Sequence, residues 1–421
     1  MRGRFGRKGA LLGAAALILT AAACGGGGGA GSAPAASNGD GSPAKTPIRI
    51  GVSVALTGDF SGDGKAILDG YQLWARDVNA RGGLLGRPVQ LVIKDDASQT
   101  QQELTNYQTL IGTEHVDLVF GPFSSLLTIP AESVAKRYGY LLLGPAGGGP
   151  KVFEQKYVGY AFVQPAAVVD SLVSFADLLK SLPPAERPKT VAYATSNDPF
   201  TEPQLVRLKP LLTAMGVQQV YWTVFPDETP DLQAEALAVV KSKADVVVLG
   251  TTSVPQVQAF IQAFIQQKYN PKVILATGGP DQGANFANAV GVQNTEGIMT
   301  ALGWTPTADT YQNQEFVQEY VAKYGGKPSD IPADAAQAYS VGQVLEQLVG
   351  IAHSLKNADL IKALHSGHVI QTLQGPMTWD DVGVPHGTGN NLIQWQGGAT
   401  KIVWPKADAQ ASFEYPKPAW P

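Results

Sequence analysis

The strongest constraint on the fold is a regular alternation of strand and helix patterns, which is clearest in residues 48–96. Ile48, Ile50, Val52 and Val54 alternate along the chain, as in a strand that is buried on both faces. A pattern with apolar residues on one helical face follows, and a glycine pair ends it before a second strand pattern. This order predicts a βαβ unit, in which a helix joins two parallel strands.

The alternation continues along the chain in two groups. Strand patterns at 116–120 and 140–143 extend the first group, and the pattern starts again near residue 166. Four strand patterns make up the second group, at 190–194, 220–224, 246–249 and 273–276. Roughly 375 residues follow position 46, which is enough chain for two domains by the usual size of domains. We therefore expect an α/β protein with two parallel sheets flanked by helices.

The first 46 residues have a different character. Four basic residues precede an apolar run, Ala10 to Ala23, that ends at Cys24, and this order predicts a secretory signal peptide over residues 1–23. Cys24 is the only cysteine in the chain, and it would become the N-terminal residue after cleavage. We expect it to carry a lipid, the alternative being a spare thiol within a signal sequence. Residues 24–46 consist mainly of Gly, Ser, Ala and Pro, which indicates a flexible tether.

Charge and motif content argue against several function classes. The net charge is −4, and removal of four basic groups with residues 1–23 makes it −8 (27 Lys and Arg against 35 Asp and Glu), so nucleic acid is not expected as a partner. No Gly-x-Ser-x-Gly motif is present, and the Gly58–Lys65 segment departs from a phosphate loop in spacing and in Ala66. His365 and His368 have no evident third metal ligand. We expect no catalysis, no cofactor and no metal.

Several segments that follow strands carry candidate binding residues. Ser124 and Ser125 open a helix, where unpaired N–H groups and a hydroxyl suit an anion, or where a serine is an ordinary N-cap. Asp281 also follows a strand, and its carboxylate suits an ammonium group or a helix N-cap. Phe200 suits contact with a ligand or core packing. The glycines at 147–149 suit ligand contact through the backbone or a plain turn.

Three short motifs together carry a family resemblance. The strand that leads into Leu56-Thr57-Gly58, the segment 77–87 (DVNARGGLLGR) and Lys94-Asp95-Asp96 resemble extracytoplasmic solute-binding proteins typified by the leucine/isoleucine/valine-binding protein, and the similarity continues to the segment 375–380. The resemblance implies a type I periplasmic-binding-protein fold with three hinge crossings, near residues 166, 301 and 378. It places 47–165 plus 302–378 in lobe 1, and 166–301 plus 379–421 in lobe 2.

The resemblance also assigns roles to the candidate residues. It implies that Ser125 holds a ligand carboxylate and that Asp281 holds an ammonium group. Gly148 stands where amino-acid binders usually have a threonine, and Phe200 stands where a tyrosine is frequent. The full set of expected ligand-binding residues is Ser124, Ser125, Ala146, Gly147, Gly148, Phe200, Thr252 and Asp281.

The expected function is that of an extracytoplasmic substrate-binding lipoprotein of an ABC importer. Its ligand would be a small solute, with an amino acid as the leading candidate. Its other partners would be the permease and ATPase of the importer, and the membrane through the lipid on Cys24. Because Gly148 departs from the pattern, an amide, a urea-like compound or an aromatic or aliphatic carboxylate stays open as the ligand. A ligand-sensing module for a membrane partner is a second class. A secreted hydrolase is disfavoured, because no nucleophile constellation is present.

Overall fold

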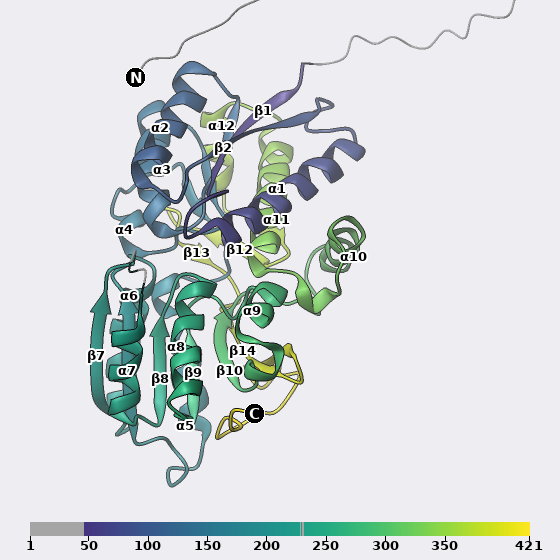
Figure 1. Cartoon of the computed structure of the whole chain (residues 1–421). Helices are drawn as coiled ribbons and strands as arrows, with labels where there is room; N and C mark the ends of the chain where they lie inside the picture. Colours follow the sequence, from purple (N-terminus) through teal and green to yellow (C-terminus); the bar gives the residue numbers. More distant parts are fainter. Residues whose placement is uncertain (1–45, 228, 230) are drawn as a thin grey trace, which may run out of the picture. The chain divides into compact units, whose positions relative to one another are not determined.

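The computed structural model describes residues 46–227, 229 and 231–421. The predicted signal peptide, Cys24 and the tether up to residue 45 lie outside the described residues. Figure 1 shows two central sheets, each flanked by helices, within the part of the chain from residue 46 onward. None of the helices in that part has the length and apolar content that crossing a bilayer would require.

The first sheet has five parallel strands in the order β2-β1-β3-β4-β5. Their bounds are β1 Ile48–Val54, β2 Val89–Asp95, β3 Leu118–Phe120, β4 Leu142–Gly144 and β5 Tyr160–Phe162. The predicted βαβ unit is confirmed: β1 and β2 pair in parallel from Ile48↔Val89 to Val54↔Asp95, and α1 (Ser61–Ala80) connects them. Because β2 is at the sheet edge, Ile93 is 38% exposed rather than buried.

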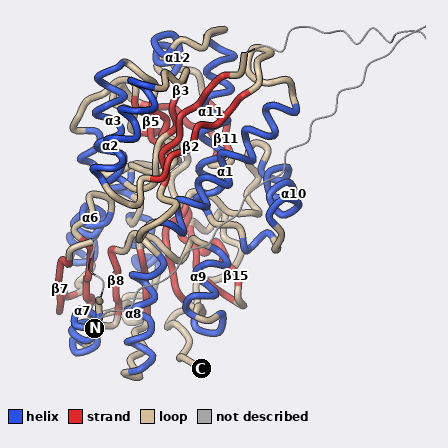
Figure 2. The backbone as a smooth tube through the Cα atoms, turned by 45° about the horizontal axis from the view of Figure 1, so that its top comes forward, coloured by secondary structure: helices blue, strands red, loops and turns tan. Residues whose placement is uncertain are grey.

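Helices cover both faces of this sheet. The remaining helices of this part are α2 Thr100–Gln108, α3 Ser125–Tyr138, α4 Pro150–Phe153, α10 Asn313–Tyr324, α11 Ala333–Ala352 and α12 Asn357–Leu364. α1 packs tightly along α11, and Figure 2 shows both helices running beside the first sheet. Gly70 and Gly342 permit this approach, because a Cβ at Gly70 would lie 2.1 Å from the Ala335 carbonyl oxygen and one at Gly342 would lie 2.2 Å from the Trp74 ring. A segment far along the chain thus completes the first lobe.

The second sheet has seven strands in the order β15-β14-β10-β9-β8-β6-β7. Their bounds are β6 Thr190–Ser196, β7 Gln218–Phe225, β8 Val246–Gly250, β9 Val273–Ala276, β10 Ile298–Leu302, β14 Asn391–Gln396 and β15 Ala399–Trp404. Its strands β6 to β10 are parallel, as expected, whereas β14 and β15 add an antiparallel edge. They are the final strands of the chain and form a hairpin, which a two-residue turn at Gly397-Gly398 allows.

Two apolar clusters cover the faces of the second sheet. The helices of this lobe are α5 Val173–Ser181, α6 Thr201–Ala214, α7 Gln233–Ser242, α8 Val254–Gln266 and α9 Gly283–Val290. A small antiparallel sheet, which the sequence patterns did not predict, is formed by β11 Ile370–Thr372, β12 Gly375–Trp379 and β13 Pro385–His386. The chain passes between the two large sheets three times: after β5, after β10 and before β14.

Candidate ligand-binding site

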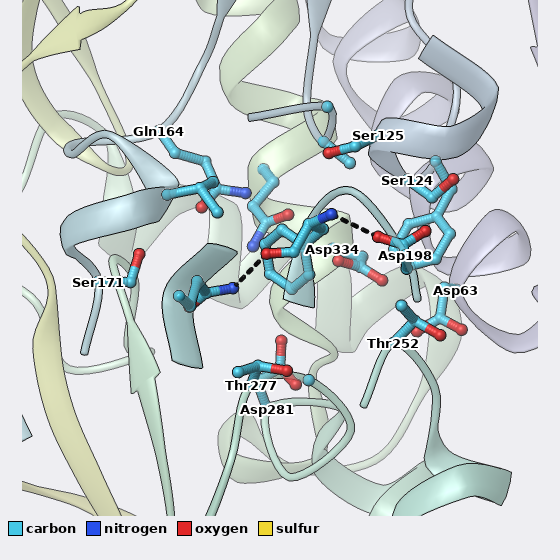
Figure 3. Close-up of a pocket in the computed structure, with 18 of the residues that line it drawn as sticks. Asp63, Ser124, Ser125, Gln164, Ser171, Asp198, Thr252, Thr277, Asp281 and Asp334 are labelled. Atoms are coloured by element: carbon cyan, nitrogen blue, oxygen red, sulfur yellow. Dashed lines mark hydrogen bonds between the residues drawn. The ribbon is translucent and has the colours of Figure 1, made fainter. Parts of the chain in front are cut away.

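A cavity of about 70 Å³ lies between the two lobes. It is lined by loops that follow β3, β4, β6, β8 and β9, and by the first turns of α1 and α11. These loops leave the carboxyl ends of parallel strands, where open α/β sheets bind their ligands. One water molecule needs roughly 10–15 Å³ of such space, so the cavity has room for several water-sized groups. Figure 3 shows the polar side chains that surround it.

Seven of the eight residues predicted to bind a ligand line this cavity. They are Ser124, Ser125, Ala146, Gly147, Phe200, Thr252 and Asp281. The eighth, Gly148, is not among the residues that line the cavity. A Cβ at Gly148 would lie 2.3 Å from Val168 and 2.4 Å from Phe162, two residues that themselves line the cavity, so Gly148 lies directly behind its wall.

The two adjacent serines have different roles at the start of α3. The Ser124 Oγ accepts a hydrogen bond from the Leu127 N–H (3.2 Å), which makes Ser124 the N-cap. The Ser125 Oγ accepts from the Gly149 N–H (2.9 Å), and this leaves the Ser125 hydroxyl proton free to donate. Ser125 is completely buried. A donating hydroxyl at a helix N-terminus makes this wall of the cavity suitable for an anion.

Phe200 and Thr252 line the opposite wall of the cavity. Phe200 belongs to the loop after β6, yet it packs against an apolar cluster of the first lobe, so it serves in packing and lines the cavity as well. The Thr252 Oγ1 lies 3.1 Å from both the Asp227 Oδ1 and the Gln256 Oε1. Its single proton is therefore used within the protein, and Thr252 offers a ligand mainly its methyl group and acceptor capacity.

Asp281 joins the two lobes near the cavity. Its Oδ1 accepts from the Gly279 N–H (2.9 Å), and its Oδ2 accepts from the Gln282 amide (3.2 Å). α9 begins after Gln282 without a side-chain cap, so Asp281 does not have the helix-capping role that the sequence left open. Its backbone carbonyl accepts from the Ala333 N–H of α11 (3.2 Å), a contact between the second lobe and the first.

Two more carboxylates lie beside Asp281. Asp63 is in the first turn of α1, which approaches β1 closely because a Cβ at Gly64 would lie 2.1 Å from the Ala55 carbonyl oxygen. Asp334 is in the first turn of α11. Burial, and then the charge of Asp281, raises the pKa of Asp63 to about 7. Burial, followed by Asp63 and Asp281, raises the pKa of Asp334 well above its usual range.

A fourth carboxylate lies in the loop after β6. The Asp198 Oδ1 accepts from the Phe200 N–H (2.6 Å), whereas its Oδ2 has no partner among the described residues. Burial, and then the charge of Asp227, raises the pKa of Asp198 to about 7. Among the described residues that line the cavity there is no Lys, Arg or His. The cavity wall is therefore rich in carboxyl groups and holds no basic side chain among its described residues.

Sequence reasoning missed three of the four carboxylates. Asp63 lies in the 57–64 segment after the first strand, and Asp198 lies two positions before Phe200, so the rule that ligands meet strand ends points to both. Asp334 follows no strand; it reaches the cavity because α11 packs along α1. No local signal marks that packing.

No group of three or more Asp, Glu, His or Cys in the described part of the chain is arranged to hold a metal ion.

Known proteins of similar sequence cover almost the whole chain. The Leu/Ile/Val-binding protein BraC3 of Rhizobium johnstonii is 25% identical over 369 residues, which are 86% of this chain and 94% of that protein. A Leu/Ile/Val-binding protein homolog of Brucella abortus is 24% identical and covers 91% of this chain and 98% of its own length.

Solved structures share the fold at lower identity. The leucine-binding protein LivK of Thermotoga maritima has a TM-score of 0.73 at 19% identity and covers 84% of this chain and 97% of its own. A solute-binding protein of R. palustris in complex with benzoate has a TM-score of 0.75 at 19% identity, with 89% and 98% covered. LivJ of Streptococcus pneumoniae in complex with isoleucine has a TM-score of 0.67 at 20% identity, with 89% and 100% covered. Residues 47–398 match the family described as periplasmic binding protein, and the chain belongs to that family.

Proposed function

We propose that this protein is the extracytoplasmic solute-binding component of an ABC importer and that it captures an amino acid between its two lobes. The observation that carries the proposal is the cavity between the lobes, with a helix N-terminus on one wall and carboxylates on the others. A zwitterion fits this arrangement, because its carboxylate would meet Ser125 and its ammonium group would meet Asp281. The names of the relatives agree, since BraC3 is a Leu/Ile/Val-binding protein and LivJ was solved with isoleucine.

The cavity does not favour a carboxylic acid that lacks an amine. The R. palustris protein was solved with benzoate, so this fold does accommodate such ligands. Here, three buried carboxylates and Asp281 would face an anion without a compensating Lys, Arg or His in the cavity wall. Burial of like charges together is costly, and an amine-bearing ligand removes that cost. An amide or urea-like ligand would leave the carboxylates without a counter-charge.

Ligand capture would use hinge closure between lobe 1 (47–165 plus 302–378) and lobe 2 (166–301 plus 379–421). Several short connections between two rigid lobes suit such a motion. A Cβ at Gly149 would lie 2.4 Å from the Pro199 carbonyl oxygen, so the lobes approach each other closely beside the cavity. A solute could enter only after this contact opens, and its burial on closure would supply the binding energy.

The position outside the cytoplasm rests on the N-terminal segment and on the family. Export through residues 1–23, a lipid on Cys24 and a tether to residue 46 would hold the lobes near the membrane, beside the permease and ATPase. A sensing role for a different membrane partner would use the same cavity. Deletion of the gene should abolish uptake of the captured solute if the protein serves an importer, and should leave uptake unchanged if it serves a sensor.

The test of the proposal begins with the purified protein. Bound solute is released by denaturation and identified by mass spectrometry, and the refolded protein is then titrated with that solute in a calorimeter. Small-angle scattering should show a smaller radius of gyration with the solute than without it. Asp281→Asn should weaken binding of an amino acid far more than binding of its analogue without the amine. Equal losses for the two ligands would remove Asp281 from ammonium recognition, and the absence of compaction on proven binding would contradict hinge closure.

A further inference from the structure

The cavity wall holds more carboxyl groups than a single ammonium group can contact. Asp63, Asp198 and Asp334 are 4%, 1% and 3% exposed, and Asp281 lines the same cavity. Figure 3 shows all four carboxylates around it. Ionised carboxylates in a protein interior require a positive partner or hydrogen-bond donors. The single ammonium group of a neutral amino acid would leave some of these carboxyl groups without a positive partner.

The four carboxylates form two groups on different elements. Asp63, Asp281 and Asp334 influence one another's protonation and come from α1, the loop after β9 and α11. Asp198 comes from the loop after β6, and the charged groups that act on it are Asp227 and Lys151, neither of which lines the cavity. The cavity therefore has two separate places at which a positive group would be stabilised.

Unpaired acceptors in the wall supply a second observation that points to a ligand. The Asp198 Oδ2, the Asp334 Oδ2 and the Gln282 Oε1 are buried and have no hydrogen-bond partner within the described residues. Gln282 is 3% exposed and is not part of the acidic groups. Buried acceptors without donors are rare in native proteins and require an explanation. All three lie on residues that line the cavity, so a molecule within it that presents N–H donors would satisfy them.

Local structure does not account for these acceptors. The bond from the Phe200 N–H occupies only one oxygen of Asp198, and Gln282 donates through its amide nitrogen to the Asp281 Oδ2, which leaves its own Oε1 unpaired. The cavity wall also includes the rings of Phe123, Phe162 and Phe200, whose faces attract cations. The wall thus combines negative charge, free acceptors and aromatic rings.

We propose that the ligand is a basic amino acid, with one positive group at Asp63, Asp281 and Asp334 and the other at Asp198. This inference rests on the proposed capture of an amino acid, because the carboxylate of the ligand is assigned to Ser125 at the start of α3. It goes further by requiring a second positively charged nitrogen in the side chain of the ligand. Such a ligand places N–H donors at both groups of unpaired oxygens.

Pairs of amino acids with and without a positively charged side-chain group test the charge requirement directly. The full-length protein, freed of bound solute by unfolding and refolding, is titrated with L-lysine and L-norleucine, L-arginine and L-citrulline, and L-ornithine and L-norvaline. In at least one pair the basic member should bind on the order of 100-fold tighter. Equal or tighter binding of the neutral members would overturn the inference and leave amino-acid capture standing. If no member of any pair bound or compacted the protein, both the inference and the proposed function would be wrong.

A diamine tests whether the carboxylate of the ligand contributes to binding. Cadaverine has the two nitrogens of lysine without its carboxylate, so it should bind more weakly than lysine. Tighter binding of cadaverine would overturn the assignment of a basic amino acid and would indicate a diamine instead.

Two isosteric variants locate the second positive group. Asp198→Asn keeps an acceptor for the Phe200 N–H, and Asp334→Asn keeps the shape of the side chain. Loss of one partner of a buried charge pair weakens binding on the order of 30-fold or more. At least one of the two variants should lower the affinity for lysine by this factor and leave the affinity for norleucine nearly unchanged. If both variants weakened the two ligands equally, neither group would hold the side-chain nitrogen, and the inference would fail.

Asp96→Asn is the matched control. Asp96 is fully buried, its Oδ1 accepts from the N–H of Ser98 two residues on (2.7 Å), and its Oδ2 has no partner among the described residues, as at Asp198. Asp96 does not line the cavity. Asp96→Asn should leave the affinity for lysine within about twofold, and a larger loss would show that removal of any buried carboxylate impairs binding.

Discussion

Asp198 should make the ligand-free protein less stable as the pH rises. Asp198 is 1% exposed, and burial, followed by Asp227, raises its pKa from 3.8 to about 7. The folded state then binds the Asp198 proton more tightly than the unfolded state does. Stability is greatest below pH 3.8, falls as the pH rises from 3.8 to about 7, and stays at the lower level above that. The carboxylate that we assign to ligand recognition therefore has a cost in the absence of ligand.

The size of this effect follows from the two pKa values. For each pH unit between these two values, the free energy of unfolding falls by about 1.36 kcal/mol. The interval from 3.8 to about 7 therefore corresponds to about 4 kcal/mol at pH 8. Asp198→Asn removes the ionisable group and keeps an acceptor for the Phe200 N–H. The variant should be more stable than the unmodified protein by up to this amount at pH 8, and the difference should approach zero near pH 4.

Urea unfolding at pH 4, 5, 6, 7 and 8 measures this difference. Fluorescence and circular dichroism should give coincident transitions before a free energy is fitted, since a two-lobe protein can unfold in steps. With a saturating basic ligand at pH 8, the unmodified protein should be more stable than the variant, because the ionised Asp198 then pairs with the positive group of the ligand. A difference between variant and unmodified protein that stays constant from pH 5 to pH 8 would refute the reasoning. Lower stability of the variant at pH 8 without ligand would refute it as well.

Three further outcomes are expected. Ser125→Ala should weaken amino-acid binding by about 1.5–3 kcal/mol in calorimetry, because a hydrogen bond to a charged carboxylate is lost. Ser124→Ala should instead lower the free energy of unfolding by about 1 kcal/mol, because the N-cap is lost. The reverse result for the two variants would contradict these roles. Gly148→Thr should lower the melting temperature without improving affinity, because its side chain would meet Phe162 and Val168; a tighter-binding variant would return this position to the site. Cys24→Ala should move the protein from the membrane fraction to the soluble fraction, and a variant retained in the membrane would contradict lipidation at this residue.

The elements that were predictable from sequence are those with a strong local period. β1, α1 and β2 are examples, because alternation of apolar residues and a one-sided helix pattern each depend on neighbours in the chain. The exposure of Ile93 and the antiparallel direction of β14 and β15 were not predictable in the same way. Strand order in a sheet decides both, and strand order depends on contacts between distant segments.

The candidate site also contains residues that the local sequence predicts and residues that only long-range packing brings in. Ser125 and Asp281 follow strands, and a polar residue in that position is visible in the sequence. The charge of the cavity is not visible there, because Asp334 enters it only through the packing of α11 on α1. Gly148 also follows a strand, but it lies behind Phe162 and Val168 rather than in the cavity wall. Whether a loop residue faces the ligand or the core depends on a single turn of the backbone.

The bond from the Ala333 N–H to the Asp281 carbonyl has a consequence for dynamics. Ala333 is the first residue of α11, and the N–H groups of a first helical turn have no partner within their own helix. Here the acceptor comes from the other lobe, so each opening of the lobes would expose this amide to solvent. Its hydrogen–deuterium exchange rate would then equal the intrinsic rate multiplied by the open fraction. A single backbone amide, next to the cavity-lining Asp334, would thus record how often the empty protein opens.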